Sequence, residues 1–225
     1  TDVTEFKWYK GIEVHKVYLS AILDLYDRRI VAFEIGERND NPLVFKTFDK
    51  AIKANPGAYP LFHSDRGFQY TNRTFHHKLK KAGINWLVLG IESHSAHVRQ
   101  GITKGKFTEA DIVQTVRMIQ DAGIRVLGNY IFGLPDDNHE SMETTLKLAQ
   151  ELNCELANFY CAMAYPGSKL FTQALEQGLK LPASWDGYSQ HSYVCEPLST
   201  KFLSAKEVLA FRDEAWKRYH QSERY

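Results

Sequence analysis

Two aspartates lie at the ends of predicted strands, where their carboxylates could bind metal ions. Asp2 lies in the segment TDVTE at residues 1–5, and Asp65 lies in the segment HSDRG at residues 63–67. Phosphodiester cleavage with two Mg²⁺ ions needs several carboxylates, because they must hold ions roughly 3.5–4 Å apart. An aspartate near a turn also serves as a cap or as a solvated charge, so both interpretations of this pair stay open.

Polar and glycine residues also follow three predicted parallel strands. They are the pair Glu92 and Ser93, the GLP segment at residues 133–135 and the YPGS segment at residues 165–168. In α/β barrels the ligand site lies at the carboxyl ends of the strands, within reach of such residues. A plain turn also explains the second segment, and a helix entry also explains the third.

The cysteines and histidines carry weaker signals. Cys154, Cys161 and Cys195 are separated by 7 and 34 positions, a spacing that favours neither a disulfide framework nor a metal site. Three reduced thiols indicate a cytoplasmic protein. Four histidines lack a companion set of cysteines or carboxylates, so we expect them on the solvated surface: His76, His77, His94 and His97.

The elements that must position Asp2 and Asp65 form a mixed α/β pattern. Alternating apolar residues predict a hairpin of strands 17–24 and 29–35. Asp40 and Pro42 predict the start of a helix that stops at residues 56–57. A short strand at residues 59–63 leads to Asp65, and a further helix begins at residue 71 or 72 and ends at Gly83.

From residue 85 the pattern changes to repeated strand–helix units. Apolar runs predict strands at residues 86–91, 124–132 and 156–163, as expected of parallel strands that are covered on both faces. Helices follow them, and Ser204 with Glu207 three positions later predicts the cap of a last helix. Three such units in series indicate a parallel sheet or a partial barrel.

The charge distribution agrees with a boundary near residue 84. Residues 1–84 carry 14 Lys and Arg against 10 Asp and Glu, and residues 85–225 carry 14 against 17. A basic half can serve a DNA partner. No segment approaches the roughly 20 apolar residues of a membrane span, so we expect no membrane partner.

Three segments of the first half resemble the integrase core of bacterial insertion-sequence transposases, a DDE family with a ribonuclease-H-like fold. They are TDVTEF at residues 1–6, YLSAILD at residues 18–24 and HSDRGFQY at residues 63–70. The resemblance implies DNA integration as the parent function, with Asp2 and Asp65 as the first two Mg²⁺-binding carboxylates of the catalytic triad. The segment that carries the family's catalytic glutamate is missing after Ile84, so we expect weak Mg²⁺ binding and no strand transfer.

The second half resembles radical SAM (S-adenosylmethionine) enzymes, in particular those with a cobalamin-binding domain. The matching segments are LGIES at residues 89–93, TKG at residues 103–105, GNYIFGLP at residues 128–135, NFY at residues 158–160, YPGS at residues 165–168 and WDGYSQHSY at residues 185–193. The resemblance places Glu92 and Ser93 near the ribose of S-adenosylmethionine and places Asn129, Ile131 and Gly133 on the strand beside its adenine.

The iron–sulfur motif of that family is absent from the sequence. Radical SAM chemistry needs a C-x₃-C-x₂-C loop for a [4Fe–4S] cluster, and none of the three cysteines lies in such a loop. The first three strands of the barrel are missing with it. We therefore expect no reductive cleavage of S-adenosylmethionine.

The sequence is most consistent with a chimera of fold class α/β. Residues 1–84 form a truncated integrase core with a partial ribonuclease-H-like sheet. Residues 85–225 form a truncated, half radical SAM barrel with a helical tail. We expect neither activity to survive. The alternatives are a nucleic-acid-binding module with residual Mg²⁺-dependent nuclease activity, and a radical SAM component that a partner chain completes.

The joint between the halves carries one structural hypothesis. A ribonuclease-H-like sheet needs another strand after its helix at residues 72–82, and the apolar segment at 86–91 arrives at that point. We expect this segment to complete that sheet by pairing with the strands of residues 1–64, instead of forming a separate barrel wall. An open half-barrel also exposes strand edges, which favours an oligomer or a partner chain.

Overall fold

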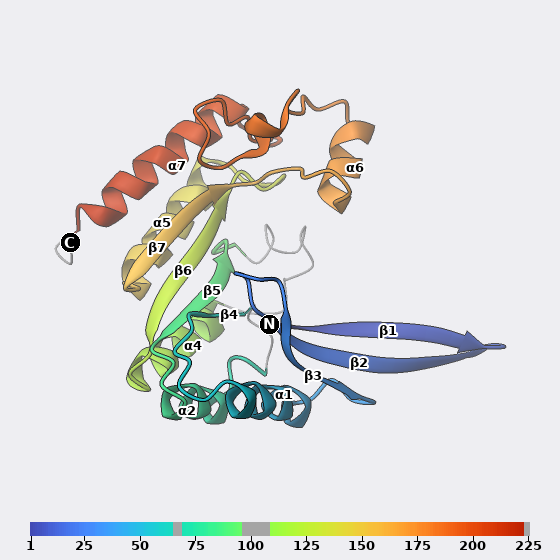
Figure 1. Cartoon of the computed structure of the whole chain (residues 1–225). Coiled ribbons are helices and arrows are strands. Elements are labelled where there is room, and N and C mark those ends of the chain that lie inside the picture. Colours follow the sequence, from blue (N-terminus) through green and yellow to red (C-terminus); the bar gives the residue numbers. More distant parts are fainter. Residues whose placement is uncertain (65–68, 96–108, 223–225) are drawn as a thin grey trace. The chain divides into compact units, whose positions relative to one another are not determined.

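The computed structural model describes residues 1–64, 69–95 and 109–222. The strands form two sheets, a three-stranded sheet in the order β1-β2-β3 and a four-stranded sheet in the order β4-β5-β6-β7 (Figure 1). By their contacts the residues divide into two compact units. The first holds residues 1–90 and 118–126, and the second holds residues 91–117 and 127–225. The fold class is α/β, as the sequence predicts.

The first sheet is antiparallel and confirms the predicted hairpin. Its strands are β1 (Asp2–Lys10), β2 (Glu13–Leu23) and β3 (Ile30–Gly36). Leu19 of β2 lies opposite Thr4 of β1 on one side and Ile35 of β3 on the other. Side chains therefore alternate across the sheet in register, and every second residue shares a face.

The helices of the first unit begin where their caps predict. In α1 (Asn41–Ala54) the side chain of Asp40 accepts a hydrogen bond from the backbone N–H of Leu43 at 3.1 Å. In α2 (Arg73–Lys81) the side chain of Asn72 accepts one from Thr74 at 2.8 Å. The two helices, β4 and the turn before α2 contribute a core of aromatic rings that contact edge to face: Phe48, Phe62, Tyr70 and Phe75.

The segment at residues 86–91 pairs with a strand of the first half, as predicted, but it does not complete the β1-β2-β3 sheet, because β4 and β5 belong to the same sheet as β6 and β7. β4 (Phe62–Ser64) runs parallel to β5 (Trp86–Glu92), and His63 lies opposite Val88. β4 begins three residues later than predicted because Pro60 has no backbone N–H to donate to a sheet. β5 therefore lies beside β4, the strand that leads to residue 65.

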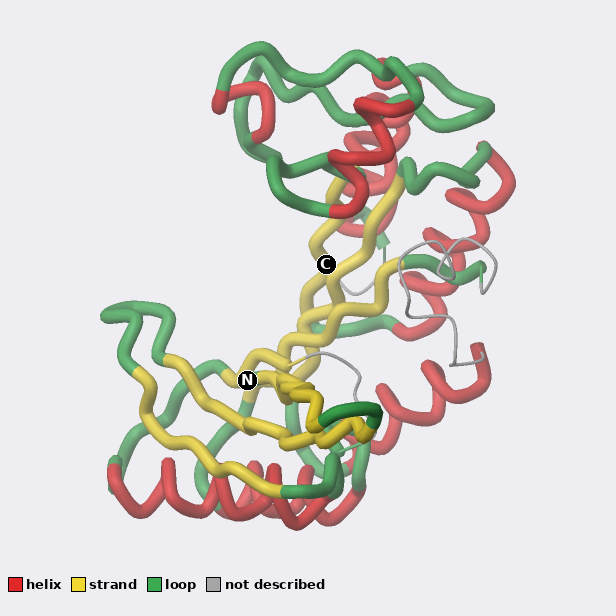
Figure 2. The backbone as a smooth tube through the Cα atoms, turned by 90° about the vertical axis from the view of Figure 1, so that its right-hand side faces the viewer, coloured by secondary structure: helices red, strands yellow, loops and turns green. Residues whose placement is uncertain are grey.

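The second unit continues the strand–helix pattern that the sequence predicts. Its elements are α4 (Glu109–Asp121), which ends in the first unit, β6 (Arg125–Phe132), α5 (His139–Leu152), β7 (Leu156–Cys161), α6 (Lys169–Glu176), a 3-10 helix η1 (Trp185–Tyr188) and α7 (Ala205–His220). β6 and β7 are parallel, with Asn129 opposite Asn158 (Figure 2). The predicted capping box of Ser204 and Glu207 is present.

Helix α7 packs on β7 and on α5, and aromatic side chains fill the interface. Phe159 of β7 contacts the rings of Phe132 and Tyr219, and Phe132 contacts Phe211. The Tyr219 hydroxyl donates a hydrogen bond to the carbonyl of Cys154 at 2.8 Å. This bond satisfies the one polar group of a ring that is otherwise buried among apolar atoms.

None of the helices in the described part of the chain combines the length and the apolar composition that a membrane span requires.

Candidate functional site

The first candidate carboxylate, Asp2, is the exposed first residue of β1. Its Oδ1 accepts a hydrogen bond from the backbone N–H of Val3 at 2.7 Å. The neighbouring Thr1 amino group donates to the carbonyl of His63 in β4 at 2.8 Å. Asp65 lies outside the described residues. The start of β1 therefore lies beside the strand that leads into residue 65.

The buried side chain of Tyr70 lies beside the start of β1. The Tyr70 side chain is 1% exposed, and its hydroxyl lies 3.3 Å from Thr1 Oγ1. The carbonyl of Tyr70 lies 2.8 Å from Nε2 of His76.

The prediction of a solvated His76 is wrong. The residue is fully buried beside Phe75 and Leu79 on the apolar face of α2. Burial lowers the pKa of the imidazole, because a desolvated ring disfavours its charged form. His76 is therefore part of the core.

The second candidate site begins at the carboxyl end of β5. Glu92 is 9% exposed and has a φ of 69°, a left-handed conformation that is uncommon for a residue other than glycine. Ser93 is fully buried, and its Oγ lies 3.3 Å from Oγ1 of Thr145 on α5. The same Thr145 oxygen accepts a hydrogen bond from the backbone N–H of His94 at 3.0 Å. Thr145 thus anchors the turn that carries Glu92 and Ser93.

Three residues expected near S-adenosylmethionine belong to this part of the chain. Asn129 and Ile131 lie on β6, and Gly133 follows it. Asn129 and Ile131 are half-buried and alternate with the fully buried Tyr130 and Phe132. The amide of Asn158 on β7 donates to Oδ1 of Asn129 at 3.1 Å. The structure therefore brings Asn129 and Ile131 together on one face.

Gly133 follows directly after β6, with a φ of 79°. Asp137, which the sequence analysis did not select, fixes the turn that follows Gly133. Its carboxylate is 1% exposed and accepts hydrogen bonds from the backbone N–H of Leu134 at 3.0 Å and from Oγ of Ser141 at 2.6 Å. Burial raises the pKa of Asp137 above its usual range. Its one sequence signal is its place directly before the helix cap Asn138.

The three cysteines are buried thiols. Burial raises the pKa of Cys161 to about 12 and also raises that of Cys195. The nucleophile and metal ligand is the thiolate, which is scarce at neutral pH when the pKa is raised. Within the described residues, no three His, Cys, Asp or Glu side chains are grouped so that they could hold a metal ion.

Comparison with known proteins assigns each half a different relative. The family model of the integrase core domain matches residues 1–90. A putative transposase of the insertion sequence IS150 from Escherichia coli is 38% identical over 85 residues, which are 37% of this chain and 29% of that protein. The integrase resemblance of the first half is thereby confirmed.

An uncharacterized methyltransferase of Pyrococcus horikoshii is 34% identical over 120 residues, which are 52% of this chain and 26% of that protein. Among solved structures, the radical SAM enzyme coproporphyrinogen III oxidase (HemN) from Escherichia coli aligns with a TM-score of 0.52 and 17% identity. That alignment covers 78% of this chain and 37% of the enzyme, and at this identity it shows the fold alone. The chain thus spans 26–37% of the length of these three proteins.

Proposed function

We propose that this chain is a folded fusion of two enzyme fragments and that, without a partner, it catalyses neither parent reaction. Residues 1–90 match the integrase core domain, and the remainder is radical SAM-like. The parent functions are DNA transposition and radical S-adenosylmethionine chemistry. The observation that carries the proposal is the pairing of β5 with β4. We infer that the radical SAM-like sequence begins before or within β5, so that it replaces the segment with the third carboxylate.

The fit of Mg²⁺ to the first half rests on Asp2 and Asp65. Asp2 lies at the start of β1, which a hydrogen bond from Thr1 to His63 holds beside β4. Two carboxylates without the third provide an incomplete ligand set for two ions. We expect weak binding of one Mg²⁺ ion and no strand transfer.

The cysteines of the second half do not fit a [4Fe–4S] cluster. All three are buried, and burial raises the pKa of Cys161 and Cys195, which favours the protonated form of these two thiols. We therefore derive no radical step for this chain. S-adenosylmethionine would be held by Glu92, Ser93, Asn129, Ile131 and Gly133, which supply polar side chains and backbone at the carboxyl half of the barrel strands. We expect binding of this molecule without its cleavage.

Two assays on the full chain test the proposal. In the first, the chain is incubated with Mg²⁺ or Mn²⁺ and a DNA duplex that ends in an insertion-sequence terminus. We expect no cleavage and no joined product. DNA cleavage that Asp2→Asn abolishes, and that the exposed-turn control Asp27→Asn leaves intact, would overturn the integrase half of the proposal.

In the second assay, the chain is treated with iron, sulfide and dithionite, and S-adenosylmethionine is added. We expect no 5′-deoxyadenosine. A cluster absorbance together with 5′-deoxyadenosine would overturn the radical SAM half. A cleavage that appears only after addition of a second chain with a C-x₃-C-x₂-C motif would instead support a component that a partner completes.

A DNA-binding module is the second candidate, and the basic charge of residues 1–84 favours it. Several of its lysines are engaged in ion pairs, including Lys50 with Glu34 at 2.6 Å and Lys78 with Asp49 at 2.7 Å. We expect a weak affinity that decreases steeply with salt, since it depends on counterion release. Fluorescence anisotropy of a labelled duplex at two salt concentrations measures it.

A further inference from the structure

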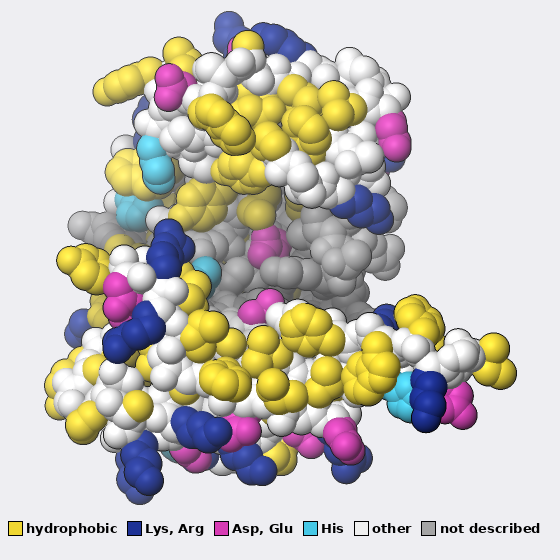
Figure 3. All heavy atoms as spheres, turned by 45° about the vertical axis from the view of Figure 1, so that its right-hand side comes forward, with side chains coloured by type: hydrophobic (Ala, Val, Ile, Leu, Met, Phe, Trp, Pro, Cys, Tyr) yellow, Lys and Arg dark blue, Asp and Glu magenta, His cyan; other side chains and the backbone are white. Residues whose placement is uncertain are grey.

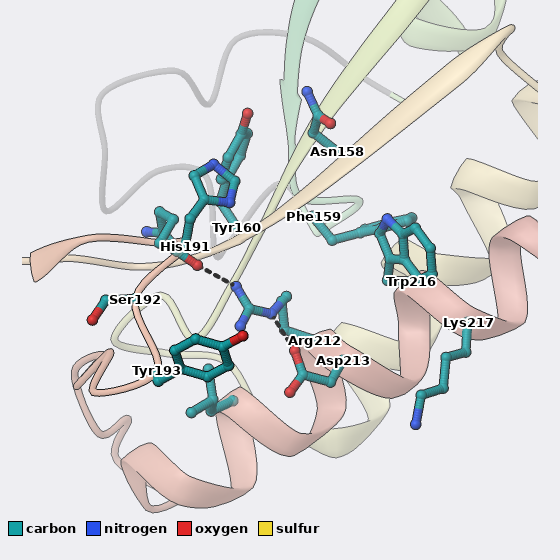
Figure 4. A pocket seen from close by; sticks show the side chains of 12 residues that line it. Asn158, Phe159, Tyr160, His191, Ser192, Tyr193, Arg212, Asp213, Trp216 and Lys217 are labelled. Atoms are coloured by element: carbon teal, nitrogen blue, oxygen red, sulfur yellow. Dashed lines mark hydrogen bonds and ion pairs between the residues drawn. The ribbon is translucent and has the colours of Figure 1, made fainter. Parts of the chain in front are cut away.

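A pocket in the second unit lies between β7, the loop of residues 190–193 and α7 (Figure 4). Its volume is about 530 Å³, within the range of pockets that bind small organic molecules. The residues that could recognise a ligand are polar or aromatic: Asn158, Tyr160, His191, Tyr193, Arg212 and Trp216. Asn158 donates a hydrogen bond to the candidate residue Asn129, whereas Arg212 and Trp216 belong to none of the segments or sites described above.

A two-point hydrogen bond fixes the loop that forms one wall. The amide of Gln190 accepts from the backbone N–H of Cys161 at 3.0 Å and donates to the carbonyl of Cys161 at 2.8 Å. The side chain thus pairs with β7 as a neighbouring strand would. A wall that is already fixed in place loses little entropy when a ligand binds.

Arg212 presents unused hydrogen-bond donors at this pocket. Its side chain is 16% exposed, its Nε donates to Asp213 Oδ1 at 2.7 Å, and its Nη1 donates to the carbonyl of Gln190 at 3.1 Å. A guanidinium group has five N–H donors. Among the residues that the structure describes, the other three N–H groups of Arg212 have no hydrogen-bond partner.

The charges around the pocket favour an anion. Arg212 and Lys217 are cationic, and among the described residues that line the pocket Asp213 is the one carboxylate. The Asp213 side chain is 57% exposed, so solvent screens its interaction with Arg212. A guanidinium with spare donors binds a carboxylate through two parallel hydrogen bonds, which gives direction as well as charge.

Aromatic rings supply the apolar part of the lining. Figure 4 shows Tyr193 near Arg212 and Trp216 on the neighbouring turn of α7, whereas Tyr160 lies beyond His191. Trp216 packs against His220 with ring centroids 4.5 Å apart and is 53% exposed, so part of its ring surface is open to a ligand. We propose that this pocket binds a small organic carboxylate with an aromatic body, whose acid group pairs with Arg212.

Isothermal titration of the full chain with indole-3-acetate tests the proposal, with indole-3-acetamide as the neutral control of the same shape. We expect the acid to bind and the amide to bind at least about tenfold more weakly, because the amide cannot form the charged pair. Equal affinities, or no binding of the acid, would overturn the proposal. Inorganic phosphate that binds as tightly as the acid would show a plain anion site and would also overturn it.

Variants separate recognition from folding. Arg212→Gln should weaken binding of the acid at least about tenfold without changing binding of the amide. Because Arg212 also supports the loop at Gln190, Tyr193→Ala provides a second variant that leaves the guanidinium in place. It should weaken both probes alike. Phe202→Ala removes an exposed ring outside the pocket and should change neither affinity. An Arg212→Gln effect that the Phe202→Ala control reproduces would contradict the assignment.

Discussion

Gly133, directly after β6, lies against Val208 of α7 so closely that a Cβ atom on the glycine would overlap the valine side chain. Gly133 also has a φ of 79°, a conformation that side chains other than glycine rarely adopt. Two independent reasons therefore require glycine here. The GLP turn is a close packing site between a strand end and the last helix, whichever ligand it contacts.

Gly133→Ala should lower the free energy of unfolding by about 2 kcal/mol or more, since it adds backbone strain and overpacking. Gly167→Ala is a matched control, because Gly167 has a φ of 84° and open space around its Cβ position. It should show the strain alone. Urea unfolding measures both. If Val208→Ala does not restore part of the stability lost by Gly133→Ala, the contact is not the cause.

Gln190→Leu should destabilise the second unit by about 1–3 kcal/mol, because it leaves the backbone N–H and carbonyl of Cys161 without their partner. It also uncovers part of the β7 edge. The neighbouring His191→Ala is the control, since His191 is exposed and makes no such pair. Hydrogen exchange at the Cys161 amide should become faster in Gln190→Leu and remain unchanged in His191→Ala. Unchanged exchange in both variants would show that the pairing does not protect β7.

Local signals in the sequence were sufficient for most elements of the fold. The helices at Asp40 and Ser204 begin where those caps predict, because a cap depends on residues only three positions away. The pairing of β5 with β4 could also be predicted, since a continuous apolar run favours a buried parallel strand.

The residues that the sequence did not reveal depend on distant partners. The sequence predicts a surface position for His76. Its burial is not visible in the local pattern, because it depends on Tyr70 and on the core around α2. Arg212 follows a charged helical pattern, and only the fold brings it to Gln190, 22 residues earlier. No periodicity in a single sequence encodes that contact.

Asp137 should make stability depend on pH in a defined direction. Burial raises its pKa above the ordinary value of 3.8, so the folded state favours the protonated acid more than the unfolded state does. Its contribution is complete below the unfolded pKa and is lost as the pH rises through the folded pKa. Asp137→Asn cannot titrate, so the stability of the wild type relative to this variant should decrease as the pH rises from about 4. Urea unfolding across this range measures the difference, and a constant or increasing difference would contradict it.

An apolar face of the β1-β2-β3 sheet should promote self-association. Glu34 binds Lys50 of α1, so the alternate residues Phe33 and Ile35 point to the opposite face, where they are 53% and 61% exposed. Apolar side chains gather on this sheet in the lower part of Figure 3. Exposed apolar patches of this kind mark interaction surfaces or aggregation sites. Sedimentation velocity should show concentration-dependent association that Ile35→Lys reduces.

The control for this patch is Ile12→Lys at the tip of the β1–β2 hairpin, where Ile12 is fully exposed. It adds the same charge away from the sheet face and should leave association unchanged. An equal effect of the two variants would indicate that net charge, and not the apolar face, controls association.

The cysteines should resist thiol reagents as long as the chain is folded. Burial raises the pKa of Cys161 to about 12, so at neutral pH nearly all of this thiol is protonated and shielded from the reagent. We expect Ellman's reagent to modify Cys161 only at the rate of unfolding, and to modify all three cysteines at once in guanidinium chloride. Cys161→Ser and Cys195→Ser identify the contribution of each thiol by mass spectrometry. Rapid modification of Cys161 in the folded chain would show an accessible thiolate, and burial would then no longer exclude an iron–sulfur cluster at these cysteines.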